Sequence, residues 1–299
     1  MSATIAVLVN PLAGRGRAAA VAEAVVPHLR RAGIRVMLLQ GHDGEEAAYL
    51  ALAAVDDGVD SLVVVGGDGM VQLGAQAVAD RGVPLGIIPA GTGNDTARSL
   101  GIDRRNPLTA ADVVVVGGCR TVDLAEVDGH VFCTVLATGL DSRVNERANA
   151  MRWPRGRLRY TVATLAELRV FRPIQYALDI DGRRVEQEAM LVAVGNGPSY
   201  GGGLRMCVGA DLSDGLLDVV VIKPLSKAEL CRVYPRLFRG THVTHRSYEH
   251  HRVSTVRIDA PGVVAYADGE RIGALPITVT ARPGALRVFA PGDAAQDVR

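Results

Sequence analysis

The stretch Val64-Val-Gly-Gly-Asp-Gly-Met70 decides the fold class, because an apolar run ends there in a glycine turn and a helical pattern follows. Three similar apolar runs, Thr4–Val9, Ile34–Leu39 and Val83–Ile88, lie in the first 120 residues. Helical spacing follows the runs at Arg17–Ala32, at Glu45–Val55, at Met70–Ala79 and from about Asp95. This alternation predicts βαβ units and a parallel sheet that is covered on both faces.

The pattern changes after Arg120, where short strand-like runs separated by turn residues replace the regular alternation. The runs are Val122–Val127, Val131–Ala137, Ile174–Ile180, Ala189–Val194, Leu217–Ile222, Val253–Asp259, Val263–Ala267, Ile277–Thr280 and Ala285–Phe289. Helical spacing interrupts them near Leu158–Phe171 and Lys227–Arg239. Many short strands predict an antiparallel sandwich or barrel, so we expect two domains, residues 1–120 and residues 121–299.

The composition excludes several classes of protein. A net charge of +1 does not fit a dedicated nucleic-acid binder, so we expect no nucleic-acid partner. The only lysines are Lys223 and Lys227, so the first 220 residues hold no P-loop of the form G-x-x-x-x-G-K-[ST]. The four cysteines form no C-x-x-C pair, which favours small buried side chains in a reducing compartment. No signal-peptide pattern opens the sequence, so we expect a cytoplasmic protein.

Glycine-rich turns lie at three strand-to-helix junctions in the N-terminal half, at Asn10–Gly16, Gly66–Gly69 and Pro89–Asp95. In an open parallel sheet such turns gather at the carboxyl edge of the strands, where ligands bind. Glycine lets backbone N–H groups approach a phosphate, and a helix start adds a positive dipole end. A single turn of this kind is also an ordinary connector, whereas three in one sheet predict a site for a nucleotide's phosphates.

Asp68 places a carboxylate among these turns, where it would repel a phosphate. Its position therefore predicts a role in holding Mg²⁺ or in positioning a water or hydroxyl group. The alternative is that Asp68 is only the N-cap of the helix that begins near Met70. Thr92 offers a hydroxyl for a phosphate or a ribose, and Asn94 and Asp95 are suited to capping a helix.

Two other motifs favour different enzymes. Gly14-Arg-Gly-Arg-Ala-Ala19 fits the loose dinucleotide pattern of dehydrogenases, but the second strand ends in Gln40 where an acidic residue would hold the ribose. Gly197-Pro-Ser-Tyr-Gly201 matches the nucleophile elbow of hydrolases. Gly202 and Gly203 follow it where the elbow needs a helix, which disfavours that interpretation.

Taken together, the motifs resemble the catalytic domain of the diacylglycerol kinase family, which includes bacterial soluble lipid kinases and sphingosine and ceramide kinases. The matching stretches are V-N-P-L-A-G-R-G (9–16), V-V-G-G-D-G-M (64–70), I-P-A-G-T-G-N-D (88–95), G-N-G-P-S-Y-G-G-G (195–203), D-L-S-D-G-L-L-D (211–218) and A-D-G-E (267–270). The resemblance implies an α/β plus β fold. A Rossmann-like parallel α/β domain, similar to those of NAD kinase and phosphofructokinase, would bind ATP in residues 1–120. An antiparallel β-sandwich would bind the lipid substrate in residues 121–299.

The resemblance also implies site residues. Those that would line the nucleotide are Asn10, Pro11, Leu12, Ala13, Gly14, Arg15, Gln40, Gly66, Gly67, Asp68, Gly69, Met70, Val71 and Thr92. Asp268 and Glu270 match an acidic D-G-E motif that includes the proposed base for the acceptor hydroxyl, and with Asp68 they are the catalytic candidates. Asp211, Asp214 and the carbonyl of Leu216 match a structural Mg²⁺ site, for which a solvated turn is the alternative.

The chain departs from the family pattern in the phosphate loops. Met70 stands where the family usually has a hydroxyl residue after G-G-D-G, so one phosphate contact is lost. Ala13-Gly14 and Arg15 stand where many members have Ser-Gly and a lysine. Arginine keeps the positive charge and can hold a phosphate with two hydrogen bonds, so these changes leave the nucleotide preference open.

The implied function is transfer of the γ-phosphate of ATP to the hydroxyl of a lipid, with Mg²⁺ as cofactor. Diacylglycerol, a sphingoid base or a monoacylglycerol is the acceptor that we expect. A kinase of a soluble acceptor such as NAD, and a catalytically silent lipid- or nucleotide-binding regulator, are the alternatives. The retained acids Asp68, Asp268 and Glu270 speak against the regulator, because a pure binder has no use for several carboxylates in one site.

The segment Arg152–Arg159 is rich in arginine and contains Trp153, which makes it a candidate for transient contact with an anionic membrane surface. A solvated helix with its loop is the alternative. We therefore expect a cytoplasmic protein that can take a peripheral position at the inner face of the membrane. The histidines between His242 and His251 match no metal-binding signature. The sequence does not determine the oligomeric state, and a homodimer is one possibility.

Overall fold

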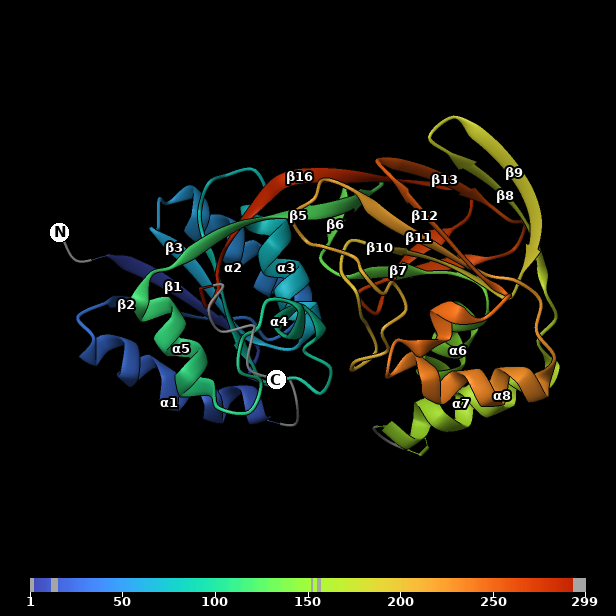
Figure 1. Ribbon diagram of the computed structural model, residues 1–299. Coiled ribbons are helices and arrows are strands. Elements are labelled where there is room, and N and C mark those ends of the chain that lie inside the picture. The colour runs from blue at the N-terminus through green and yellow to red at the C-terminus, as the bar shows by residue number, and fades with distance from the viewer. Residues whose placement is uncertain (1–2, 12–15, 152, 155–156, 293–299) are drawn as a thin grey trace. The chain divides into compact units, whose positions relative to one another are not determined.

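The computed structural model describes residues 3–11, 16–151, 153–154 and 157–292 and divides the chain into two compact units (Figure 1). Unit 1 holds the chain up to Leu124, the short segment Leu212–Asp214 and the chain from Arg282 onward. Unit 2 holds Ala125–Asp211 and Gly215–Ala281. The chain therefore passes from one unit to the other within strand β5 (Cys119–Val127), and again within strand β16 (Ile277–Phe289).

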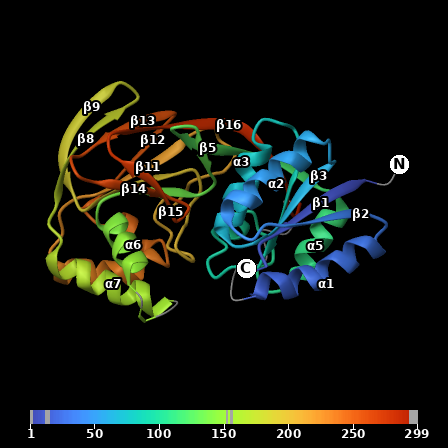
Figure 2. The same cartoon turned by 180° about the vertical axis from the view of Figure 1, so that it is seen from behind.

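Unit 1 is built from alternating strands and helices. Besides parts of β5 and β16 they are β1 (Thr4–Val9), α1 (Arg17–Arg31), β2 (Arg35–Gln40), α2 (Gly44–Asp56), β3 (Ser61–Gly66), α3 (Asp68–Val78), β4 (Leu85–Pro89), α4 (Asp95–Ser99) and α5 (Pro107–Val116). The strands pair in parallel in the order β2–β1–β3–β4 (Figure 2). The predicted parallel α/β fold of the N-terminal half is confirmed.

Helices on both faces of this sheet explain why its central strands are apolar throughout. Every residue of β3 and of β4 is buried. Helix α1 packs beside α5, and α2 packs beside α3 on the opposite face. The sequence analysis missed α5, although Asn106 caps it by accepting a hydrogen bond from the Leu108 N–H and Pro107 follows in the first turn.

Unit 2 consists mainly of antiparallel strands. Its elements are β6 (His130–Phe132), β7 (Val135–Ala137), α6 (Leu140–Ala150), α7 (Arg157–Val170), β8 (Ile174–Ile180), β9 (Arg183–Ala189), β10 (Leu191–Gly195), β11 (Leu217–Ile222), α8 (Lys227–Leu237), the 3₁₀ helix Thr241–Thr244, β12 (Tyr248–Val253), β13 (Thr255–Asp259), β14 (Val264–Ala267) and β15 (Glu270–Ala274). One sheet has the order β12–β11–β10–β7–β14–β15. Strands β9, β8, β13 and the first part of β16 form a second antiparallel layer.

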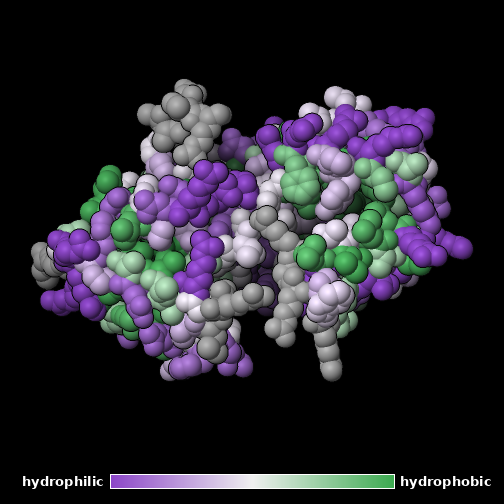
Figure 3. Space-filling model, turned by 90° about the horizontal axis from the view of Figure 1, so that it is seen from below, coloured by the Kyte–Doolittle hydropathy of each residue, from purple (hydrophilic) through white to green (hydrophobic). Residues whose placement is uncertain are grey.

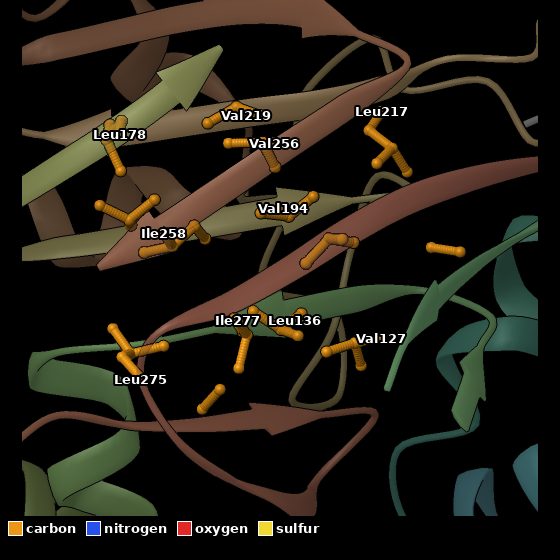
Figure 4. Packing of buried hydrophobic residues seen from close by; sticks show 14 of the residues in the cluster. Val127, Leu136, Leu178, Val194, Leu217, Val219, Val256, Ile258, Leu275 and Ile277 are labelled. Atoms are coloured by element: carbon orange, nitrogen blue, oxygen red, sulfur yellow. The ribbon is translucent and has the colours of Figure 1, made fainter. Parts of the chain in front are cut away.

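The two layers face each other across a hydrophobic core (Figure 4). Leu136 and Val194 of the first sheet point toward Leu178, Val256 and Ile277 of the second layer. Since all five side chains are buried, this core holds the sandwich together by removing apolar area from water, and each such side chain contributes about 1.5–3 kcal/mol. The predicted antiparallel β-sandwich is confirmed.

Helices α6, α7 and α8 cover the other face of the first sheet. Alternate residues of β10 and β11 point to this face, where Ala193 and Val220 pack against Val144 of α6 and Leu230 of α8. Because both faces of these central strands are covered, they lack the alternation of apolar and polar residues that a one-sided antiparallel strand shows.

Several elements differ from the prediction. Strand β16 runs unbroken from Ile277 to Phe289, although Pro283 and Gly284 indicated a turn between two strands. Gly284 has a positive φ of 65°, and its N–H donates to the carboxylate of Asp123 at 2.7 Å, so the chain passes this point without ending the strand. The expected run Val131–Ala137 is two strands, β6 and β7. The structure also adds α6, β9, β12 and β15, whose polar sequences gave weak signals. Among the described helices, none is long and apolar enough to cross a membrane.

Candidate functional site

The predicted nucleotide residues of unit 1 gather at the carboxyl edge of its parallel sheet. Asn10 directly follows β1, and Val9, the last residue of β1, pairs with Gln40, the last residue of β2. Gly66 ends β3 and pairs with Pro89 at the end of β4, so the turn that contains Thr92 begins at the same edge. Leu12, Ala13, Gly14 and Arg15 lie outside the described residues, while Pro11 precedes them in a half-buried position.

Glycine is required where two of the turns meet. A Cβ on Gly91 would lie 2.4 Å from the Cα of Gly67, which is closer than two atoms can approach without moving the backbone. The Ala90 N–H also donates to the Gly66 carbonyl at 2.7 Å. The side chain of Asn94, held at a φ of 52°, bonds both the N–H and the carbonyl of Gly91 at 3.0 Å. These contacts therefore hold the backbone of the two turns against each other in one conformation.

The side chain of Met70 lies in the core of unit 1 and not on the surface of the turn. Its side chain is buried and packs beneath Gly66, where a Cβ would lie 2.5 Å from the Met70 Cγ. The side chain of Met70 therefore belongs to the core, and Gly66 leaves room for it. Gly69, next to it in the first turn of α3, is exposed, so the backbone at the start of this helix faces solvent.

The carboxylate of Asp68 holds the start of a neighbouring helix. Its Oδ1 accepts hydrogen bonds from the N–H groups of Asp95 at 2.7 Å and Thr96 at 3.3 Å, at the start of α4. The N-cap of its own helix α3 is Gly67. The alternative, that Asp68 is the N-cap of the helix that begins near Met70, is wrong: the Asp68 carboxylate accepts from the first amides of α4 instead, which the sequence could not indicate.

In unit 2, Asp268 lies in the tight turn of the β14–β15 hairpin. Asp268 and Gly269 have φ values of 49° and 91°, which is the pattern of a type I′ turn. The half-buried carboxylate points back to the segment between β6 and β7. Its Oδ2 accepts from the Cys133 N–H at 2.6 Å, and its Oδ1 accepts from the N–H and the hydroxyl of Thr134 at 2.9 and 2.5 Å and from the Val135 N–H at 3.3 Å.

The pKa of Asp268 reflects two opposing effects. Burial raises it above the ordinary value of 3.8, and the hydrogen bonds from Thr134, Cys133 and Val135 lower it. The net shift is upward. A carboxylate with a raised pKa that is fixed in one orientation has the properties of a general base.

Asn196 fixes the same segment from the other side, and the sequence analysis assigned it no role. It is buried, its Nδ2 donates to the Cys133 carbonyl at 2.9 Å, and its N–H donates to the Thr134 carbonyl at 2.8 Å. The signal was present in the G-N-G-P-S stretch. The partners of Asp268 and Asn196 lie too far away in sequence for any local pattern to show them.

The remaining predicted site residues are exposed or half-buried. Glu270 is exposed at the start of β15. Asp211 is exposed and Asp214 and Leu216 are half-buried in the turn that precedes β11. Among the described residues no group of three His, Cys, Asp or Glu side chains could hold a metal. The oxygen atoms of Asp211, Asp214 and Leu216 nevertheless fit Mg²⁺ in kind, because this ion prefers hard oxygen ligands and keeps several waters.

Unit 2 contains a further polar group that the sequence did not reveal. Asp141 of α6 bonds Tyr200 and Asn145, and burial raises the pKa of its carboxyl to about 6. Unit 2 also has a pocket of about 380 Å³, lined by one face of α6, by Glu167 and by residues 262–264. Asp268 and Glu270 do not line this pocket.

Comparison with known proteins decides which family has this arrangement. The family model of the diacylglycerol kinase catalytic domain matches residues 4–127. The model of the YegS C-terminal NAD kinase beta sandwich-like domain matches residues 134–290. A diacylglycerol kinase of Mycobacterium tuberculosis is 44% identical over 293 residues, which cover 96% of this chain and 95% of that protein. The chain belongs to the diacylglycerol kinase family. The resemblance stated from the motifs is confirmed.

Other members of the family also match this chain over most of their length. A diacylglycerol kinase of Bacillus subtilis is 28% identical over 90% of both chains, and a probable lipid kinase YegS-like protein of Pseudomonas fluorescens is 31% identical over 90% of both. A crystal structure of a putative diacylglycerol kinase from Bacillus anthracis covers 96% of this chain and 97% of its own, with a TM-score of 0.80 and 23% identity. This similarity shows that the two proteins share the fold.

Proposed function

We propose that this member of the diacylglycerol kinase family transfers the γ-phosphate of ATP to the hydroxyl of diacylglycerol. The observation that carries the proposal is the 44% identity, over nearly the whole chain, to a protein named diacylglycerol kinase. The kinase motifs support it, because Asp68, Asp268 and Glu270 are all retained.

Unit 1 would hold ATP at the carboxyl edge of its sheet. Gly67 and Gly91 are half-buried and Gly69 is exposed, and without side chains their backbone can be approached closely by phosphate oxygens. Asn10, Gln40 and Thr92 add polar side chains at the same edge. Because phosphoryl transfer has a loose transition state, fixed geometry and charge stabilisation matter more here than base strength.

Asp268 would orient the acceptor hydroxyl and take its proton. Oδ1 is committed to Thr134 and Val135, whereas Oδ2 accepts one hydrogen bond, from Cys133, among the described residues. Since each carboxylate oxygen has two lone pairs, Oδ2 is the atom that can accept the substrate's hydrogen bond. The raised pKa makes it a better base than an ordinary aspartate.

Mg²⁺ would offset the charge of the ATP phosphates when it is bound. We assign Asp68 to this ion, through waters, and the turn of Asp211, Asp214 and the Leu216 carbonyl to a second, structural ion. Asp68 is suited to its role because the amides of Asp95 and Thr96 fix its Oδ1. A cytoplasmic location, with access to the inner face of the membrane, is part of the same proposal.

The test is ADP release from ATP and Mg²⁺ with a panel of acceptors: diacylglycerol, monoacylglycerol, sphingosine, ceramide and NAD. We expect diacylglycerol to give the highest kcat/KM. Turnover with NAD alone, without detergent or vesicles, would replace the proposal by a kinase of a soluble acceptor. Absence of turnover with all of them, together with retained ATP binding, would favour the silent regulator.

A further inference from the structure

The pocket of unit 2 is lined mainly by one face of helix α6. The α6 residues of this lining lie at helical spacing, and they are Ser142, Arg143, Glu146, Arg147 and Ala150. Helix α6 packs between α7 and β14, so Glu167 of α7 and residues 262–264 at the start of β14 complete the lining (Figure 2). The volume of about 380 Å³ lies in the range of about 300–1,000 Å³ that is usual for small-molecule sites.

The lining of the pocket is charged, unlike the surface nearby. Four of its side chains carry a charge, namely those of Arg143, Glu146, Arg147 and Glu167. On the outer surface of the unit 2 helices, by contrast, hydrophobic side chains gather in Figure 3, and Leu165 of α7 is 61% exposed. An acyl chain in the pocket would take water away from the charged groups at a large cost in free energy, so the lining suits a polar ligand.

A buried carboxylate holds Arg147 in place. The Nε of Arg147 donates to the Oε1 of Glu167 at 2.5 Å, and Glu167 is buried. The side chain of Arg147 itself is 43% exposed, and its terminal nitrogens have no hydrogen-bond partner among the described residues. Arg147 therefore presents N–H donors to the pocket in an orientation that is already fixed before a ligand binds.

Arg143 brings a second guanidinium to the same pocket. It lies one turn before Arg147 on α6, so the two side chains are neighbours. The Arg143 guanidinium is 5.7 Å from the centre of the buried Phe171 ring, and no described carboxylate lies within ion-pair distance of it. Glu146, the other acid of the lining, pairs with Arg271 from outside the pocket at 3.7 Å. The pocket therefore keeps the positive charge of Arg143.

We infer that this pocket binds the phosphate group of a small water-soluble phosphomonoester. Two neighbouring guanidiniums can hold different oxygens of one phosphate, whereas a single Arg would satisfy both oxygens of a carboxylate. The first turn of α6 lies at the pocket through Ser142, so the positive end of the helix also favours an anion here. Ile174 and Val263 supply an apolar wall for the organic part of the ligand. The inference goes beyond the proposed function, because neither Asp268 nor Glu270 lines the pocket.

The segment Arg152–Arg159, which was predicted to contact a membrane, supplies no described side chain to this lining. Arg152 and Arg155 lie outside the described residues. Arg159 is half-buried, and its guanidinium donates to the Met151 carbonyl at 3.4 Å. Membrane contact by this segment stays a prediction that is separate from the phosphate pocket.

The experiment titrates the protein with glycerol 3-phosphate in a calorimeter. Inorganic phosphate, glycerol, and dihexanoyl phosphatidate below its aggregation concentration are the comparison probes. We expect one molecule of glycerol 3-phosphate to bind per chain, inorganic phosphate to bind more weakly because it lacks the organic part, and glycerol not to bind. The titration is repeated with ADP and Mg²⁺ at saturating concentration, which would fill the glycine turns of unit 1. The heat of glycerol 3-phosphate binding should remain.

Variants of the two arginines locate the binding site. Arg143→Gln should weaken the binding of glycerol 3-phosphate roughly 10- to 100-fold, because it removes charge-assisted hydrogen bonds. Arg143→Lys should recover part of the affinity, since Lys keeps the charge without the planar fork. Arg147→Gln is combined with Glu167→Gln, so that no buried carboxylate loses its partner, and the pair should give a similar loss. Arg169→Gln is the matched control, since it removes an exposed charge near the end of α7 outside the pocket, and it should bind like the wild type.

Several results would overturn the inference. Absence of binding by the wild type, or equal affinity of the wild type and Arg143→Gln, would do so. Loss of the heat in the presence of ADP would place the phosphate in unit 1 instead. Binding of dihexanoyl phosphatidate without binding of glycerol 3-phosphate, or equal affinity for inorganic phosphate and glycerol 3-phosphate, would contradict a soluble phosphomonoester as the ligand. A protein that binds glycerol 3-phosphate as expected but does not phosphorylate diacylglycerol would contradict the proposed function and leave this inference in place.

Discussion

Replacement of Asp68 separates its structural role from its proposed catalytic one. Asp68→Ala removes the acceptor of the Asp95 and Thr96 N–H groups, which lie in a part-buried position. Loss of a capping acceptor costs about 1–2 kcal/mol. Asp68→Asn keeps an oxygen for both amides but loses the charge, so the fold should lose less than about 0.5 kcal/mol. Both variants should lose turnover roughly 10- to 100-fold if the charge acts on the ion of the nucleotide.

The assay pairs ADP release with thermal unfolding and with hydrogen exchange of residues 91–99. The control is Asp103→Ala, because Asp103 also accepts from the amides of Arg105 and Asn106. It should lose stability and keep turnover. If Asp68→Asn turned over at the wild-type rate, Asp68 would be a structural residue only. If Asp68→Asn destabilised the loop as much as Asp68→Ala, lost activity could be attributed to unfolding and the argument from charge would fail.

Three further predictions follow from the same geometry. Gly91→Ala places a Cβ 2.4 Å from the Cα of Gly67, so it should weaken ATP binding in calorimetry and destabilise the protein by about 1–3 kcal/mol. The control Gly44→Ala, whose Cβ would meet nothing within 4 Å, should change neither quantity. Asp141 has a pKa of about 6 in the folded protein against an ordinary value of 3.8, so its contribution to stability is fully present below pH 3.8 and is lost as the pH rises through 6. Asp141→Asn should therefore stabilise the protein above pH 6 by at most about 3 kcal/mol and flatten the dependence of Tm on pH between 4 and 6. An unchanged profile would refute this. Thr134→Val removes the hydroxyl that lowers the pKa of Asp268, so the acid limb of the pH profile of kcat/KM should move to higher pH, and an unmoved limb would show that another group is titrating.

The sequence predicted the parts of the fold in which local pattern and final structure agree. The apolar runs of β1, β3 and β4 lie between helices, so burial on both faces is visible in the residues themselves. Helix α6 was missed because only Leu140, Ser142, Val144 and Ala148 of it are buried and the rest is polar. Strand β9 was missed for a similar reason, since it pairs only with β8 and most of its residues are at least partly exposed.

The site residues were predicted by type, and their partners were not. Glycine-rich turns, and a carboxylate within such a turn, can be recognised in a sequence because they interrupt the apolar pattern of the neighbouring strands and helices. The hydrogen bonds of Asp68 to Asp95 and of Asp268 to Thr134 join residues 27 and 134 positions apart, and they depend on how strands pair. Pairing across such separations is set by the packing of the whole unit. The buried Met70 shows the same limit, because its packing under Gly66 explains a departure that the sequence alone presented as a lost phosphate contact.

The central claim is that Asp268 activates a diacylglycerol hydroxyl for attack on ATP, and single-turnover phosphate transfer from labelled ATP tests it most directly. The wild-type protein should form labelled phosphatidic acid, and Asp268→Asn should form it roughly 10²- to 10⁴-fold more slowly while it binds ATP with unchanged affinity. Equal rates for the two proteins, or no labelled lipid from the wild type, would contradict the account.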